Sequence, residues 1–244
     1  QFTPENQNTY EYKAHKSFTL TQTDVTRHQF LNNSSNEVSK SYYDFARINF
    51  YLSGSADPFY SKSFRKFLQD FKASKFPNMY RIHIHTNGSL WTQSMWDTMK
   101  EVQPYVKTCE VSIDAAKQDT YENKTRIGGK WNILLENLKF ITKIETIEWY
   151  CFSFVVQDTN YKEMYDFYKM IEEYFKDRKV AWEVKLTQIV NWNTFTDEEF
   201  KLKTVHDKEH KEHTNFLNEL HRIKELPNIV HNFSHLTKNK KQLI

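Results

Sequence analysis

The regular alternation of β-rich and helical runs limits the fold of this 244-residue chain more than any other feature. Strand-like runs start about 30 residues apart, which is the spacing of βα units. They cover residues 17–21, 46–53, 80–86, 108–114, 149–157 and 180–188. Because parallel strands need crossover connections that are usually helical, the pattern predicts an α/β fold with a mostly parallel sheet in sequential strand order.

The segments between these strands carry apolar residues at the i, i+3, i+4, i+7 spacing of amphipathic helices. They predict helices at 61–74, 93–103, 130–143, 164–175, 197–203 and 208–224. Six βα units build either a doubly wound sheet or a partial β/α barrel. We expect the α/β domain to cover 17–195, with a polar arm at 1–16 before it and a helical extension at 196–244 after it.

The positions of the four glycines indicate where a ligand binds. Gly54 and Gly88 follow predicted strands, while Gly128 and Gly129 precede a predicted helix. Glycine reaches positive φ and lets a ligand approach the backbone closely. Open α/β sheets and barrels hold their ligands at the carboxyl ends of strands. The turns that contain Gly54 and Gly88 therefore predict a single ligand-binding rim.

The composition limits the partners and the compartment. The 34 basic residues are offset by 31 acidic ones to a net charge of +3, which argues against nucleic acid as a partner. No apolar stretch approaches the roughly 20 residues of a membrane span, and no signal-peptide pattern is present. We therefore expect a cytoplasmic protein without membrane contact. Cys109 and Cys151 fall in predicted buried strands, which favours free thiols over a disulfide.

Several short motifs follow the predicted strands in a characteristic order. They are Ser-Gly-Ser-Ala-Asp-Pro at 53–58, His-Thr-Asn-Gly at 85–88, Val-Ser-Ile-Asp-Ala at 111–115 with the segment 121–129, and Phe-Val-Val-Gln-Asp-Thr-Asn at 154–160. Together they resemble the radical S-adenosylmethionine (SAM) superfamily, in particular its twitch- or SPASM-associated members. The resemblance runs from about Arg47 to Thr196. It implies a partial (βα)6 barrel with a helical C-terminal extension.

The resemblance also implies a SAM site at the carboxyl-terminal rim of the barrel. The turn at 53–57 would receive the methionyl ammonium, Arg126 the methionyl carboxylate, and Ser112 with Asp114 the ribose hydroxyls. Val155, Val156 and the strand end at 186–188 would form an apolar slot for adenine. The cofactor-binding residues expected on this basis are Ser53, Gly54, Ser55, Ala56, Asp57, Ser112, Asp114, Arg126, Val156 and Leu186.

Two of these residues have simpler alternatives. Asp57 precedes a proline, and an Asp-Pro pair commonly forms a turn that caps a following helix, here the one near Ser61. Arg126 lies four residues after Glu122, so the two side chains are able to pair along a helix.

The sequence departs from the family at its cluster motif. The family holds a [4Fe–4S] cluster with three cysteine thiolates in a Cys-x3-Cys-x2-Cys loop after the first strand, and such clusters need thiolate ligands. The corresponding stretch, residues 19–30, contains no cysteine, and its single histidine, His28, does not replace three thiolates. Two alternatives follow: the loop was lost in evolution, or the sequence omits it. A second departure is Ser55-Ala56, where the family often has Gly-Gly.

The functional interpretation follows the resemblance and its departure. The resemblance implies SAM-dependent radical hydrogen abstraction from an unknown small molecule or peptide, by a protein that is degenerate or lacks its cluster loop. The alternative is a non-catalytic SAM- or nucleotide-binding or scaffold protein. No catalytic residue and no metal ligand is assigned.

Two groups of histidines have open interpretations. His83 and His85 alternate on a predicted strand and share one face, with His85 nearer the rim. His85 is either a packed barrel histidine or a residue that handles protons or binds substrate. His206, His210 and His213 fall on one face of the predicted helix 208–224 and the turn before it. They form either a solvated charged face or a metal-chelating pair at i, i+4.

Overall fold

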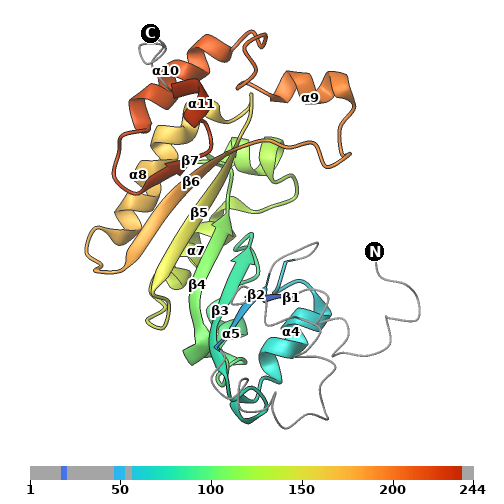
Figure 1. Cartoon of the computed structure of the whole chain (residues 1–244), viewed down its shortest axis with the longest axis vertical. Helices are drawn as coiled ribbons and strands as arrows, with labels where there is room; N and C mark the ends of the chain where they lie inside the picture. The colour runs from blue at the N-terminus through green and yellow to red at the C-terminus, as the bar shows by residue number, and fades with distance from the viewer. Residues whose placement is uncertain (1–17, 21–46, 53–56, 238–244) are drawn as a thin grey trace, which may run out of the picture. The chain divides into compact units, whose positions relative to one another are not determined.

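The computed structural model describes residues 18–20, 47–52 and 57–237. Its strands form one sheet in the order β1-β2-β3-β4-β5-β6-β7, as Figure 1 shows. Six of these strands, β2 to β7, run parallel, and helices alternate with them. The predicted α/β fold with sequential strand order is therefore confirmed.

The strand bounds agree with the predicted runs to within two residues. The strands are β1 (Phe18–Leu20), β2 (Ile48–Leu52), β3 (Met79–Thr86), β4 (Val106–Ser112), β5 (Trp149–Val156), β6 (Ala181–Gln188) and β7 (Ile229–His231). Two findings differ from the prediction of six βα units. The first strand, β1, pairs antiparallel with β2. The sixth parallel strand is instead β7, which lies in the segment predicted to be helical and pairs with β6.

The helices that follow the strands begin and end near their predicted positions. The α-helices are α4 (Lys62–Gln69), α5 (Gln93–Asp97), α6 (Gln118–Thr120), α7 (Trp131–Ile141), α8 (Met164–Phe175), α9 (Asp197–Lys203), α10 (His213–Ile223) and α11 (Ser234–Thr237). Shorter turns are η2 (Ala73–Lys75), η3 (Gln103–Tyr105), η4 (Tyr121–Thr125) and η5 (Tyr161–Glu163). Among the residues that the structure describes, no helix is long and apolar enough to cross a membrane.

Three predicted helices were too long. The helix predicted at 61–74 ends at Gln69. The helix predicted at 93–103 ends at Asp97, where the Thr98 hydroxyl donates to the Met95 carbonyl, and its last predicted residue, Gln103, instead begins the short turn η3. The helix predicted at 208–224 begins only at His213, since the residues before it form successive turns. The spacing of apolar residues alone does not reveal the local hydrogen bonds and turns that shorten these helices.

The described chain divides into two compact units. The first comprises the chain up to Glu110 together with 143–149, and its core is aromatic. Phe50 of β2 stacks on Phe67 of α4 with ring centroids 6.2 Å apart, and Phe67 also contacts Phe71. Burial of such rings contributes about 2–3 kcal/mol each, which is why α4 packs its Phe64–Phe67–Leu68 face on the sheet.

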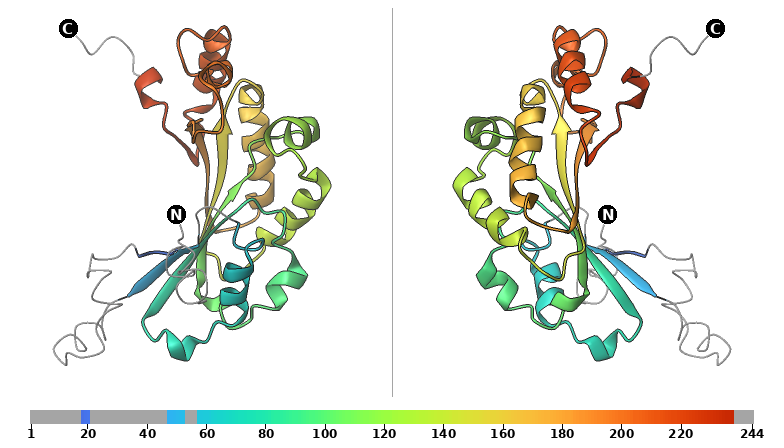
Figure 2. Two further views of the ribbon diagram at one scale, coloured as in Figure 1. Left: turned by 90° about the vertical axis from the view of Figure 1, so that its right-hand side faces the viewer. Right: turned by 90° about the vertical axis from the view of Figure 1, so that its left-hand side faces the viewer.

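The second unit comprises 111–142 and the chain from Tyr150 onward. Figure 2 shows α7 and α8 on the same side of β5. Phe154 of β5 packs on Phe167 of α8 with centroids 4.9 Å apart, and Phe175 stacks on Trp182 of β6 at 5.5 Å. The even-numbered side chains of β5 thus face the helices, which leaves the odd-numbered ones on the opposite face.

Candidate functional site

Strand β3 of the first unit has one apolar and one polar face, as predicted. Ile82 and Ile84 are fully buried, whereas His83 and His85 lie on the other face. His83 is a packed residue: its Nδ1 lies 2.9 Å from the Thr108 hydroxyl, and its ring centroid lies 5.0 Å from that of Tyr51. The packed interpretation therefore holds for His83.

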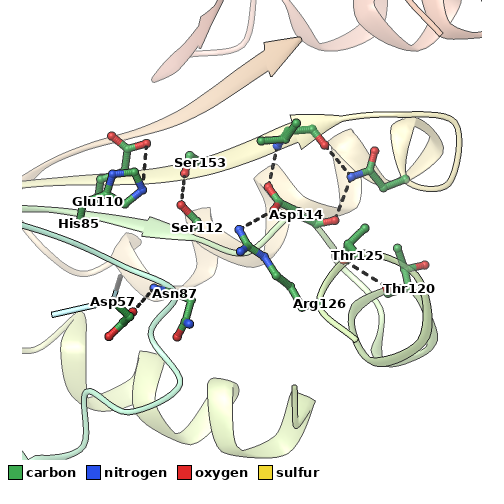
Figure 3. A network of polar contacts seen from close by, with 12 residues as sticks. Asp57, His85, Asn87, Glu110, Ser112, Asp114, Thr120, Thr125, Arg126 and Ser153 are labelled. Atoms are coloured by element: carbon green, nitrogen blue, oxygen red, sulfur yellow. Dashed lines mark hydrogen bonds and ion pairs between the residues drawn. The ribbon is translucent and has the colours of Figure 1, made fainter. Parts of the chain in front are cut away.

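His85 lies one step further toward the carboxyl end of β3 and is more open. Its side chain is 40% exposed, and its Nε2 lies 3.9 Å from Oε1 of Glu110, whose side chain is only 12% exposed (Figure 3). This distance allows an ion pair when the imidazole is protonated but exceeds that of a hydrogen bond.

Asp57 joins the ends of β2 and β3 within the first unit. Its Oδ2 accepts from the Asn87 amide at 2.8 Å (Figure 3). The same oxygen accepts from the Thr86 hydroxyl at 2.6 Å, and Oδ1 accepts from the Phe59 amide at 2.9 Å. The carboxylate therefore receives three donors from its own unit. The alternative interpretation of Asp57 is confirmed in part: Asp57 forms a turn in which its carbonyl accepts from the Tyr60 and Ser61 amides, but the residue that caps α4 is Ser61.

Asp114 plays a different part at the end of β4 in the second unit. Its φ is 62°, in the left-handed region that Asp tolerates better than most residues. Its Oδ1 accepts from the Val155 amide at 2.7 Å, and its Oδ2 pairs with Nη2 of Arg126 at 2.5 Å (Figure 3). The strand end thus holds a buried carboxylate and a guanidinium together.

Arg126 retains donor capacity beyond this ion pair. Its side chain is 31% exposed, and its Nε is buried without a hydrogen-bond partner in the described part of the chain. A buried orphan donor on a cation suits an anionic ligand. The alternative pairing of Arg126 with Glu122 is wrong, because Glu122 accepts from the Trp131 amide at the start of α7.

A single turn of π-helix, η4, carries the chain from Tyr121 to Arg126, and such turns are frequent at functional sites. Gly128, with φ 89°, and Gly129 then lead into α7. A Cβ on Gly129 would lie 2.6 Å from the Tyr121 ring and 2.9 Å from the Arg126 carbonyl oxygen, so only glycine fits there. Burial raises the pKa of the Tyr121 phenol.

Two buried residues after β5, Asn160 and Glu163, support this arrangement, and neither was among the predicted site residues. The Asn160 side-chain amide donates to the Asp114 and Val155 carbonyls, both at 2.9 Å. Glu163 accepts from the Ala116 amide and from the Thr120 hydroxyl. Asn160 closes the fourth motif noted above, whereas Glu163 acts on residues more than forty positions earlier, which no local pattern reveals.

The remaining predicted site residues have the following positions. The Ser112 hydroxyl lies 2.9 Å from that of Ser153. Val156 and Leu186 are fully buried, while Val155 is partly exposed on the opposite face of β5. Ser53, Gly54, Ser55 and Ala56 lie outside the described residues. The expected convergence of Asp57 with Ser112 and Arg126 stays a prediction, because Asp57 belongs to one unit and the other two to the other.

The three histidines near α10 do not share a helix face. His210 and His213 lie in or just after turns, and their rings contact the Leu202 and Val205 carbonyls at 3.0 Å each. His206 is half-buried, and burial lowers its pKa. Both earlier interpretations, a solvated helix face and a helical metal pair, are therefore wrong.

The described residues do not fit an iron–sulfur cluster. Cys109 and Cys151 are fully buried in strands, and burial raises the pKa of the Cys109 thiol, which disfavours the thiolate that a cluster needs. No group of three or more His, Cys, Asp or Glu side chains suited to a metal occurs within the described ranges. Residues 19–30, where the family has its cysteine loop, lie almost wholly outside those ranges and contain no cysteine.

Comparison with known proteins places the fold in one class. The parallel sheet with its alternating helices is a partial barrel-like α/β fold. Among solved structures, the chain is similar to SuiB of Streptococcus suis, a radical SAM peptide-modifying enzyme crystallised with its precursor peptide SuiA. The TM-score is 0.50 at 12% identity, and the match covers 75% of this chain but only 38% of SuiB. No protein-family model matches the sequence, and neither does any curated protein.

Proposed function

We propose that this chain is a radical SAM-like protein that binds SAM through the residues at the strand ends of its second unit. The observation that carries the proposal is the Arg126 guanidinium, held by Asp114 with a buried Nε that has no hydrogen-bond partner among the described residues. The methionyl carboxylate of SAM is an anion of suitable size for such a cation. The similarity of fold to SuiB supports the same ligand class.

Different residues of the second unit would bind different parts of SAM. Arg126 would hold the carboxylate, and the Ser112 hydroxyl would bond to the ribose. The structure changes the expected part of Asp114, because its carboxylate is already engaged by Val155 and Arg126. We therefore assign Asp114 the task of orienting Arg126. Val156 and Leu186 back the adenine slot from the core, and Val155 presents its side chain on the other face.

In the radical SAM family, bound SAM supplies a 5′-deoxyadenosyl radical that abstracts hydrogen from the substrate. That chemistry needs an electron from the cluster, and the cysteines of this chain do not fit one. We therefore propose SAM binding for the chain and derive no radical step from it. The substrate class to test first is a peptide, since SuiB binds one.

The cysteine content supports a second candidate, a non-catalytic SAM- or nucleotide-binding or scaffold protein. The chain has two cysteines, both buried in strands, whereas the cluster requires three available thiolates. Anaerobic reconstitution with iron and sulfide separates the candidates. A stoichiometric cluster with release of 5′-deoxyadenosine would support the enzyme, and SAM binding without either product would support the non-catalytic protein.

Titration calorimetry with SAM tests the shared proposal. The wild-type chain is expected to bind, and Arg126→Ala should weaken binding by about 1.5–3 kcal/mol, the range for a hydrogen bond to a charged group. Arg178→Ala is the matched control, because Arg178 lies against the Tyr150 ring and belongs to none of these contacts. Equal binding by wild type and Arg126→Ala would refute the site.

A further inference from the structure

We infer that Asn160 is a positioning residue, which acts through Asp114 to hold the Arg126 guanidinium in its ligand-binding orientation. This inference rests on the proposed function, in which the ligand is SAM. Asn160 is 1% exposed, so it acts on the ligand only through its neighbours.

Asn160 bonds to the ends of two neighbouring strands at once. Its Nδ2 donates to the carbonyl oxygens of Asp114 and Val155, and its Oδ1 accepts from the Gln157 amide at 2.8 Å. A primary amide offers two donors and an acceptor on one short side chain. An Asp would place a carboxylate against two carbonyl oxygens, and a Ser has too few donors, so this set of bonds requires the amide.

The bond to Asp114 fixes a backbone conformation that would otherwise be disfavoured. With φ at 62°, Asp114 turns its carbonyl toward Asn160 and its carboxylate toward the Val155 amide and Arg126. A non-glycine residue in the left-handed region persists where its surroundings hold it there. Asn160 supplies that restraint on the carbonyl, and Val155 supplies it on the carboxylate.

Arg126 depends on this arrangement because few other contacts restrain it. It follows the short turn η4, its side chain is 31% exposed, and its guanidinium pairs with the Asp114 carboxylate. An arginine has many rotamers, and ordering them costs conformational entropy. When Asp114 is held in advance, that cost is met before the ligand arrives.

The Arg126 Nε–H signal in a ¹H–¹⁵N NMR spectrum tests the inference without any ligand. Burial of Nε slows its exchange with water, so the wild type should show a distinct signal that Arg126→Lys removes and thereby assigns. We expect Asn160→Ala to lose this signal. Asp114→Asn should lose it too, since it keeps an acceptor for Val155 but removes the charge that faces Arg126. Asn160→Ser gives the same readout should the alanine variant fail to fold.

Thr142→Val is the control for general loss of stability. It removes another buried hydrogen bond of the second unit, from the Thr142 hydroxyl to the Leu138 carbonyl at 2.7 Å. This variant should melt at a lower temperature yet keep the Arg126 signal. An Asn160→Ala protein that keeps the signal would overturn the positioning role.

SAM binding by calorimetry then separates this inference from the proposed function. If the wild type binds, Asn160→Ala should bind SAM about tenfold more weakly, which corresponds to the loss of one hydrogen bond between Arg126 and the ligand. Thr142→Val should bind SAM like the wild type. Equal binding by Asn160→Ala would overturn the inference. If the wild type does not bind SAM, the proposed function fails, and the NMR result alone decides whether Asn160 positions Arg126.

Discussion

Asp57 in the first unit and Asp114 in the second both follow a parallel strand, but their carboxylates have different surroundings. Asp57 receives two backbone amides and a hydroxyl, all neutral donors of its own unit. Asp114 receives one amide and one guanidinium, and its backbone adopts the left-handed conformation. The same residue type at equivalent strand ends thus ties a turn together in one unit and orients a cation in the other.

The comparison teaches which strand end is prepared for a ligand. The three neutral donors of Asp57 fix the position of its carboxylate without neutralising its charge, and they tie the turn after β2 to the end of β3. A guanidinium that keeps an orphan buried N–H is able to take a further anion. This contrast supports the anion site that we propose in the second unit.

The largest effect is expected from truncation of the two aspartates. Asp114→Ala should lower the free energy of unfolding by about 2–4 kcal/mol, because it leaves a partly buried guanidinium and a buried amide unpaired. Asp57→Ala should cost about 1–3 kcal/mol, since only neutral donors lose their partner. Urea unfolding of both variants measures the difference. A larger cost for Asp57→Ala than for Asp114→Ala would contradict the contrast.

The next largest loss of stability is expected from substitution of the adjacent glycines Gly128 and Gly129, which tests the packing beside Arg126. Gly129→Ala should destabilise the protein by about 1–3 kcal/mol, because its Cβ would overlap the Tyr121 ring and the Arg126 carbonyl. Gly128→Ala meets open space and suffers only from its positive φ, at about 1 kcal/mol. The melting temperatures of the two variants compare the cost of steric overlap in Gly129→Ala with the cost of backbone strain in Gly128→Ala. Equal melting temperatures would show that the turn after η4 yields easily.

A smaller difference is expected between the two histidines of β3. His83→Ala should cost about 1–2 kcal/mol through loss of the Thr108 bond and of ring packing. His85→Ala should change stability by less than about 0.5 kcal/mol, since this side chain is 40% exposed. Urea unfolding near neutral pH checks both. A large loss with His85→Ala would assign this residue a structural role.

A further effect is confined to alkaline pH and concerns the second unit. Burial, with the hydrogen bond to Glu172, raises the pKa of Tyr168 from the ordinary 10.0 to about 12. The folded protein then keeps this proton after the unfolded chain has lost it. The contribution of Tyr168 is therefore complete below pH 10 and is lost as the pH rises to about 12. Tyr168→Phe should flatten this part of the stability profile, and an unchanged profile would refute the assignment.

The sequence by itself determined the strands and helices that follow a strong period. The bounds of α8 and α9 were predicted to the residue, and those of the six predicted strands to within two. The sharing of one face by His83 and His85 followed from the period of two alone. Such features depend on neighbouring residues, whose side chains the backbone places at fixed intervals.

Only the tertiary structure decided the partners of the site residues. Glu122 was the local candidate for Arg126, but the partner is Asp114, and Asn160 reaches Asp114 across forty-six positions. The antiparallel direction of β1 and the addition of β7 to the sheet were equally beyond local pattern. These features depend on which segments, distant in the sequence, pair with one another when the sheet forms. A periodic pattern in the sequence does not encode that choice, because strands as short as β1 and β7 are selected by the edge that they pair with.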